Sequence, residues 1–190
     1  MDFSKIRTVH VIIGIVVLLL LWVGAGYNGL ITSREAMDAS WAQVETQYQR
    51  RADLLPNLIN TVKGAARFEQ STLQQVTEAR TKWMGAGTRS EKIAAAGGLD
   101  SALARLLVTV EAYPQLQSVQ AFRDLMTQLE GTENRIGTAR RDFNEAVRIY
   151  NLRVKRFPGN VLAGFFGFVP EAFFESDDGA DTVPTVNFDQ

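Results

Sequence analysis

The clearest feature of the hydrophobic pattern is an uncharged apolar run over residues 9–26. As an α-helix this run would be about 27 Å long, close to the ~30 Å hydrocarbon core of a bilayer. Trp22 and Tyr27 lie at its far end, where aromatic side chains favour the membrane interface. We predict a short N-terminal flank over residues 1–8 and a transmembrane anchor over residues 9–29.

A cleaved secretory signal is the alternative for this run, because Gly24-Ala25-Gly26 resembles a small-residue cleavage site. The run is long for the apolar part of a signal peptide, and the helical pattern continues beyond Tyr27. We therefore favour an uncleaved anchor.

Apolar residues after the anchor recur every seven positions, a spacing typical of helices packed lengthwise against other helices. Two such series occupy residues 30–62: Leu30, Met37, Val44, Arg51 and Leu58, and Trp41, Tyr48, Leu55 and Val62. Pro56 interrupts this stretch, and Asp53 could cap a new helix start. We predict a kink or break over residues 51–55.

Further helices are predicted over residues 68–84 and 99–113, with a softer segment at 88–98 between them. The longest series has no gap, and it ends before Pro158-Gly159: Phe122, Leu129, Ile136, Phe143, Tyr150 and Phe157. No useful stretch alternates as a strand would. The predicted fold is all-α, a single N-terminal transmembrane helix followed by an elongated antiparallel four-helix-type bundle over residues 30–158.

The composition changes after the bundle. Residues 159–175 form an apolar segment too short to span a membrane, and residues 176–190 form an acidic tail that we expect to be disordered. The segment is rich in phenylalanine, which could cover the core, touch the membrane surface or meet a partner: Phe165, Phe166, Phe168, Phe173 and Phe174.

The amino-acid composition excludes several classes of functional site. The chain has no cysteine and one histidine, which excludes disulfides, thiolate catalysis and the usual zinc sites. The basic residues are spread along helices, so nothing favours a nucleic-acid partner. We expect no cofactor and no bound metal.

Polar residues on the predicted helices are the only candidates for a site: Arg50, Arg51, Asp53, Asn57, Glu133, Arg140, Asn144, Tyr150 and Asn151. Glu133 and Arg140 lie seven positions apart in a row with Met126, so both are expected to face the bundle interior and to pair. They could form a buried acid–base pair or a ligand pocket, or a satisfied network that sets helix register. We favour the network, because no nucleophile, phosphate loop or second metal ligand accompanies them.

Several motifs resemble the LemA family of bacterial membrane-anchored helical proteins. They are Tyr27-Asn28, the run from Arg50 to Lys63, Glu78-Ala79-Arg80, Val110 to Pro114, Glu130 to Ile136, Ala139 to Asn144, Tyr150-Asn151, Phe157-Pro158 and Phe166-Gly167-Phe168. The resemblance implies one N-terminal span, a four-helix-type bundle and no established enzymatic activity. Some members carry a lipoprotein cysteine where this chain has Gly26, so lipid anchoring is not available here.

The resemblance also implies a setting in the bacterial envelope, since related proteins include a magnetosome-membrane component and family genes often neighbour those for membrane metalloproteases. Lys5 and Arg7 precede the span and only Arg34 follows closely, which favours a cytoplasmic N-terminus. We expect a single-pass inner-membrane protein with its bundle on the periplasmic side.

We expect a non-enzymatic scaffold or membrane-organising role, with the lipid bilayer, further copies of the chain and other membrane proteins, such as a metalloprotease, as partners. A membrane-tethered enzyme or a small-ligand-binding protein that uses the Asp/Glu/Arg/Tyr residues is the alternative.

Overall fold

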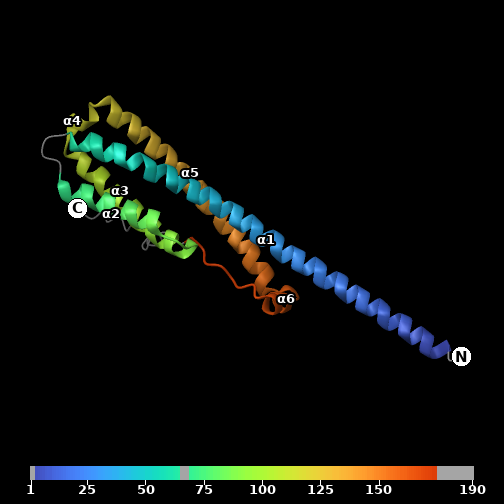
Figure 1. Cartoon of the computed structure of the whole chain (residues 1–190). Helices are drawn as coiled ribbons and strands as arrows, with labels where there is room; N and C mark the ends of the chain where they lie inside the picture. Colours follow the sequence, from blue (N-terminus) through green and yellow to red (C-terminus); the bar gives the residue numbers. More distant parts are fainter. Residues whose placement is uncertain (1–2, 65–68, 175–190) are drawn as a thin grey trace, which may run out of the picture. The chain divides into compact units, whose positions relative to one another are not determined.

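The computed structural model describes residues 3–64 and 69–174, with side chains from His10 onward, and all regular elements in these ranges are helices (Figure 1). The all-α prediction is confirmed. The predicted acidic tail over residues 176–190 lies outside the described ranges. The elements are α1 (Phe3–Lys63), α2 (Gln70–Gly85), α3 (Arg89–Glu111), α4 (Pro114–Gln117), α5 (Gln120–Lys155) and α6 (Gly159–Phe166).

The chain divides into two compact units. The described part of unit 1 contains α1 up to Ala42 together with Asp142–Phe173, and that of unit 2 contains Gln43–Arg141 together with Phe174. In unit 1, α1 packs directly on α5, where the rings of Trp41 and Phe143 meet edge to face with centroids 5.3 Å apart. In unit 2, α2 lies against α3.

The seven-residue series of α1 form its buried face. Every member is buried, including Arg51, which is only 2% exposed, while neighbouring positions such as Arg50 and Asp53 face outward. Spacing along the sequence therefore identified the packed face of this helix correctly.

The kink or break predicted over residues 51–55 does not take the form of a break, because α1 runs through Pro56 without interruption. Proline has no N–H, so it cannot bond the carbonyl four residues earlier, which belongs to Ala52. Here Nε of Arg80, on α2, donates a 2.8 Å hydrogen bond to that carbonyl oxygen. A side chain from another helix thus supplies the missing donor, and the helix continues.

The predicted soft segment at residues 88–98 is also wrong, because α3 begins at Arg89 and continues through Gly97-Gly98. Its start is a capping box. The Thr88 hydroxyl accepts from the Glu91 N–H at 3.2 Å, and the Glu91 carboxylate accepts from the Thr88 N–H at 3.0 Å. These bonds satisfy orphan donors at the helix start and nucleate a helix that two glycines would otherwise weaken.

Helix α5 buries its predicted series from Phe122 to Tyr150, but the last member, Phe157, is 82% exposed. The helix ends at Lys155, so Phe157 is no longer held on the buried face. The short helix α6 follows. The sequence marked its residues as apolar but did not identify them as a helix.

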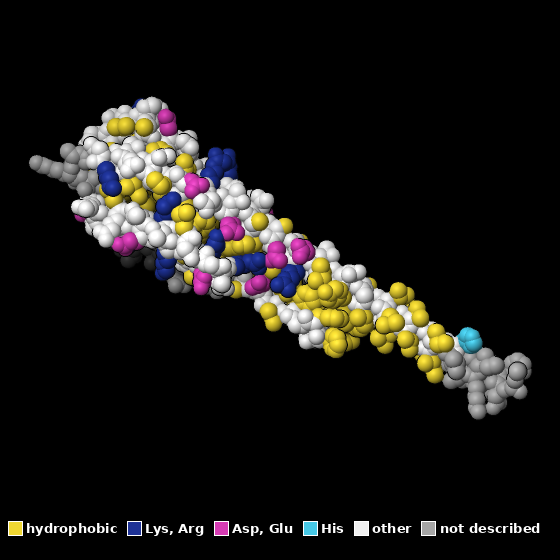
Figure 2. Space-filling model, in the orientation of Figure 1, with side chains coloured by type: hydrophobic (Ala, Val, Ile, Leu, Met, Phe, Trp, Pro, Cys, Tyr) yellow, Lys and Arg dark blue, Asp and Glu magenta, His cyan; other side chains and the backbone are white. Residues whose placement is uncertain are grey.

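Among the residues that the structure describes, two helices, α1 and α3, are long and apolar enough to cross a bilayer. They differ in burial: none of the apolar window of α1 is buried, whereas 39% of that of α3 is. In α3, Leu99, Leu103, Leu106 and Val110 form a buried stripe. Figure 2 shows the hydrophobic side chains of α1 lying bare along its N-terminal part.

Candidate functional site

The main polar cluster of unit 2 surrounds the carboxylate of Asp100. Tyr48 and Arg51 reach it from α1, Arg140 reaches it from α5, and Glu133, also on α5, joins through Arg51. We call these five residues the Asp100 cluster. It ties three helices together at one point within unit 2.

Both carboxylate oxygens of Asp100 are occupied. Tyr48 donates its hydroxyl to Oδ2 at 2.9 Å, and Arg140 donates to the same oxygen. The two terminal groups of the Arg51 guanidinium donate to different carboxylates: Nη1 donates to Oδ1 of Asp100, and Nη2 donates to Oε2 of Glu133. Arg140 also donates to the Tyr48 oxygen. Two guanidinium groups face two carboxylates, so the cluster is neutral overall when all four are ionised.

Burial governs the ionisation of the cluster. It raises the pKa of Asp100, and the neighbouring Arg51 and Arg140 charges oppose this rise. Burial and the negative charge of Asp100 also raise the pKa of Tyr48 far above its ordinary value, so this phenol stays protonated. Burial alone would lower the pKa of Arg140. The nearby Tyr48 and Asp100 oxygens stabilise its positive charge more strongly, so the pKa of the Arg140 guanidinium is raised. Tyr48 therefore acts as a donor and not as a base.

Aromatic rings enclose the cluster. The Tyr48 ring stacks on Trp83 at 5.8 Å and on Phe174 at 6.2 Å between centroids, and the Arg140 guanidinium lies 4.3 Å from the centroid of Phe174. Such stacking shields the ion pairs from water and adds cation–π attraction. Phe174 thus serves as part of the core cover that the sequence allowed for the phenylalanine segment.

A cavity of about 430 Å³ lies beside the cluster in unit 2, with Arg51, Asp100 and Glu133 on one side and Leu103, Leu107, Met126 and Leu129 among its apolar lining. Within the described ranges, no group of acidic or histidine side chains is arranged to hold a metal. The Asp100 carboxylate at the centre of the cluster already accepts from three donors. The arrangement can position helices or receive a small molecule in the cavity, whose lining also includes Ser101 and Glu130.

The structure unites three predicted site residues, Arg51, Glu133 and Arg140, but corrects their pairing. Glu133 pairs with Arg51, and Arg140 pairs with Asp100. The Glu133 side chain is 65% exposed, so it does not point into the interior as expected. The seven-residue spacing placed Glu133 on the buried face of α5. In the structure Glu133 lies at the exposed edge of that face, where it pairs with Arg51.

Three other predicted residues, Arg50, Asp53 and Asn57, lie exposed on α1 and do not join the cluster. The Asp53 carboxylate accepts a 2.8 Å bond from Gln49 on its own helix. Asn144 lies on the unit 1 part of α5 and is half-buried.

Tyr150 and Asn151 form a separate clamp in unit 1. The Tyr150 hydroxyl donates to the Val169 carbonyl at 2.9 Å. The Asn151 amide donates to the Glu171 carbonyl and accepts from its N–H, both at 2.8 Å. Desolvation of Tyr150 raises the pKa of its phenol, which keeps the proton that this bond needs. The clamp fixes the segment after α6 against α5.

The predicted phenylalanine contact residues separate into two groups. Phe168 and Phe174 are buried, which agrees with a core-covering role, while Phe165, Phe166 and Phe173 are exposed. The sequence reading missed Asp100 at the cluster centre. Its signal was present, since Asp100 lies four residues after Ala96 and three before Leu103, both on the buried stripe of α3.

Comparison with known proteins decides the family. The sequence model of the LemA family matches residues 40–188. The chain belongs to the LemA family.

Relatives of this LemA-family chain include magnetosome proteins. Magnetosome protein MamQ 2 of Paramagnetospirillum magneticum is 30% identical, with 82% of this chain and 67% of the relative covered. Magnetosome protein MamQ of Magnetospirillum gryphiswaldense is 28% identical over the same shares. Protein LemA of Metamycoplasma hominis is 21% identical, with 80% of this chain and 69% of the relative covered. These similarities support a membrane-associated protein. The names of these relatives give no enzymatic role.

Proposed function

We propose that this LemA-family protein is a non-enzymatic scaffold, anchored in a membrane by α1, that organises copies of itself or other membrane proteins. The observation that carries the proposal is the internal pairing of the Asp100 cluster: its central carboxylate accepts from three donors, and its phenol stays protonated. A network of this kind sets helix register, and its central carboxylate and phenol are engaged with their own partners instead of being free for acid–base chemistry.

In this proposal α1, α2, α3 and α5 form an antiparallel four-helix bundle, and α1 alone spans the bilayer. The bare apolar side chains of α1 need a lipid environment, whereas α3 already buries its stripe. The capping box of α3 and its Asp100 contacts also belong to a helix inside a folded domain. We place the anchor in a bacterial inner membrane, with other membrane proteins, such as a metalloprotease, as candidate partners.

Binding of a small molecule is the second candidate function. The 430 Å³ cavity supports it, because the lining residue Arg51 has a buried Nε atom without a hydrogen-bond partner among the described residues. A ligand with an acceptor group and an apolar body would satisfy that atom and fill the apolar side of the cavity.

Native mass spectrometry of the full-length chain, released from mild detergents, tests both functions. The scaffold proposal expects oligomers that retain no small molecule in the cavity beside the Asp100 cluster, and monomers across all detergents would contradict self-association. A bound mass that disappears in Leu107→Trp, which fills the cavity, would favour the ligand function instead. Val108→Trp is the matched control, because Val108 is 68% exposed and does not line the cavity.

A further inference from the structure

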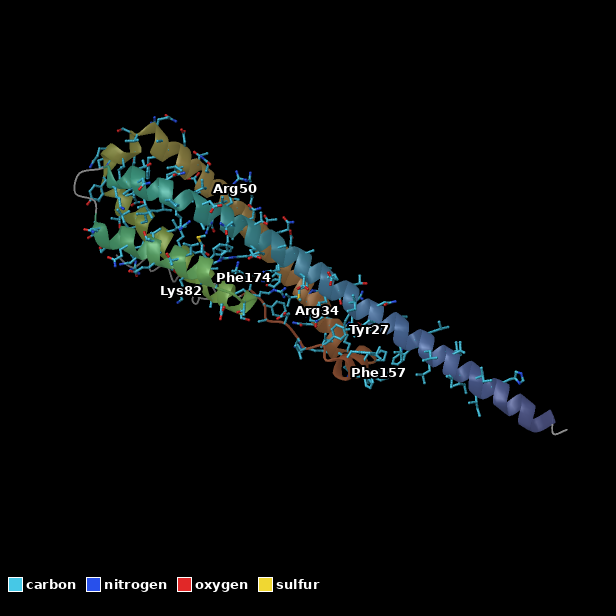
Figure 3. The ribbon with its side chains drawn as sticks, in the orientation of Figure 1. Tyr27, Arg34, Arg50, Lys82, Phe157 and Phe174 are labelled. Carbon is cyan, nitrogen blue, oxygen red and sulfur yellow. The ribbon has the colours of Figure 1, made fainter. Side chains whose placement is uncertain are left out.

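The helix α6 lies against the turn of α1 where the apolar run ends. A Cβ on Gly26 would come within 2.3 Å of Cδ1 of Leu162, so only glycine admits this approach without a shift of that side chain. On the next residue, the Tyr27 ring lies 4.8 Å from Phe166 and 6.0 Å from Phe168 between centroids. Figure 3 shows Tyr27 beside α6, and all these residues belong to unit 1.

This contact sets the depth of α6 relative to a bilayer. Leu18 lies near the middle of the apolar run, and Gly26 lies about 12 Å further along the helix axis. Half of a hydrocarbon core is about 15 Å thick, so Gly26 and the attached α6 come to the boundary between acyl chains and headgroups.

Large apolar side chains are exposed at this level. Phe165 is 84% exposed, Phe157 82% and Val161 57%. Each would lose the favourable free energy of transfer from water to an apolar environment if it stayed in water. In Figure 2 the hydrophobic side chains of this region continue directly into those of the apolar part of α1. The surface that already meets lipid on α1 therefore extends onto α6.

A cavity of about 380 Å³ opens beside this apolar surface, lined by Gly26, Gly29, Arg153, Arg156, Phe157 and Gly159 among others. Its lining includes two cations and no acid. Gly159 permits a close approach of the chain to the end of α5 beside the cavity, because a Cβ there would lie 2.3 Å from the Arg153 carbonyl oxygen. Arg153 donates to the Gly29 carbonyl, and the Arg156 guanidinium is exposed with no partner among the described residues.

We propose that this cavity binds the phosphate of an anionic phospholipid headgroup, with Arg153 and Arg156 as donors and with Phe157 and Phe165 in the acyl chains below it. The inference rests on the proposed span of α1. Guanidinium groups pair well with phosphate, and basic side chains at a bilayer surface are attracted to anionic lipids. A cationic pocket beside exposed phenylalanines, at the height of the interface, fits a lipid that supplies both a phosphate and an apolar tail.

Spin labels on single cysteines test the depth, because the chain has no native cysteine. We would label Leu18→Cys, Phe165→Cys and Ile149→Cys in the full-length chain in lipid nanodiscs and compare collisions with oxygen and with a water-soluble nickel chelate. Labels at Leu18 and Phe165 should favour oxygen. Ile149, an exposed residue two turns before Phe157 on the same unit, should favour the chelate.

The outcomes separate the two proposals. If the label at Phe165 favours the chelate as the label at Ile149 does, while the label at Leu18 favours oxygen, the lipid-site inference is overturned and the proposed function is not. A label at Leu18 that favours the chelate would overturn the span and the proposed function with it.

Retention of lipid in native mass spectrometry tests the headgroup. The wild-type chain should keep phosphatidylglycerol in preference to phosphatidylcholine, and Arg156→Gln should reduce that retention about fivefold, as the loss of ~1 kcal/mol predicts. Arg148→Gln, which removes a surface arginine paired with Glu145 on the same helix, should leave it unchanged. Equal retention in Arg156→Gln, or displacement of the lipid by millimolar inorganic phosphate alone, would overturn the lipid site.

Discussion

At the residue scale, the hydrogen bond from Arg80 to the Ala52 carbonyl explains how a proline can stand inside α1, about two turns before its end. The carbonyl loses its helical partner to Pro56 and would otherwise be an unsatisfied acceptor. The stability of a long helix thus depends on one side chain that lies 28 residues away in the sequence.

The first prediction concerns this bond. Arg80→Met should lower the free energy of unfolding by about 1–3 kcal/mol, because it leaves the carbonyl without a donor. In a Pro56→Ala background the same substitution should cost less, since the new N–H of residue 56 can bond Ala52. Urea unfolding in mild detergent, followed by circular dichroism, measures the cycle. Equal costs in both backgrounds would contradict the account, and Arg105→Met serves as a control on an exposed arginine that bonds only Gln75.

The second prediction concerns pairing in the Asp100 cluster. Arg140→Met should destabilise the protein by about 1–3 kcal/mol, because it removes one of the two guanidinium groups that bond the half-buried Asp100 carboxylate. Adding Asp100→Leu should recover part of the loss, because the remaining Arg51 and Glu133 balance each other.

Adding Glu133→Leu to Arg140→Met should recover less, because the Glu133 side chain is 65% exposed and water already screens its charge. Thermal melting of the three variants distinguishes these pairings. If Glu133→Leu recovers more stability than Asp100→Leu, the pairing of Glu133 with Arg140 that we predicted from the sequence is correct instead.

At the element scale, α3 owes its early start to its capping box. Glu91 accepts from the N–H groups of Gly87 and Thr88, and these bonds lower the pKa of its carboxyl. A carboxyl whose pKa is lower in the folded state stabilises the fold above its unfolded pKa. That contribution is lost as the pH falls through the lowered folded value.

The third prediction follows from this sign. Glu91→Gln should be less stable than the wild type at pH 7, and the difference should shrink as the pH falls through the lowered pKa of the wild-type carboxyl, which then takes up its proton. Urea unfolding at pH 7 and at successively lower pH values measures the difference. Glu111→Gln, at the other end of α3, should show no such convergence, and a Glu91 difference that does not change with pH would contradict the capping account.

At the scale of the whole molecule, the proposed anchor would set the topology. Lys5 and Arg7 precede the apolar run, and a basic flank tends to stay in the cytoplasm. The fourth prediction is that protease added to intact spheroplasts digests the helical domain from about Arg34 onward. Protection until the membrane is lysed would reverse the orientation, and a cytoplasmic marker protein controls for lysis.

The sequence alone determined the all-helical class, the apolar run of α1 and the buried faces of α1 and α5. These are local properties, because side chains seven positions apart on a helix fall on one face whatever the partner is. Spacing along the chain was therefore sufficient to assign Leu30, Val44 and Ile136 to buried faces.

Only the tertiary structure decided which polar groups meet. Asp100 joins Arg51 and Arg140 across 49 and 40 residues of chain, and Arg80 completes α1 from a different helix. A hydrogen bond forms only when two atoms come within about 3 Å, and periodicity does not specify which helix supplies the second atom. The same limit applies to the position of α6. This helix packs closely beside Gly26 because glycine has no Cβ, and a hydrophobic pattern does not reveal such a close approach.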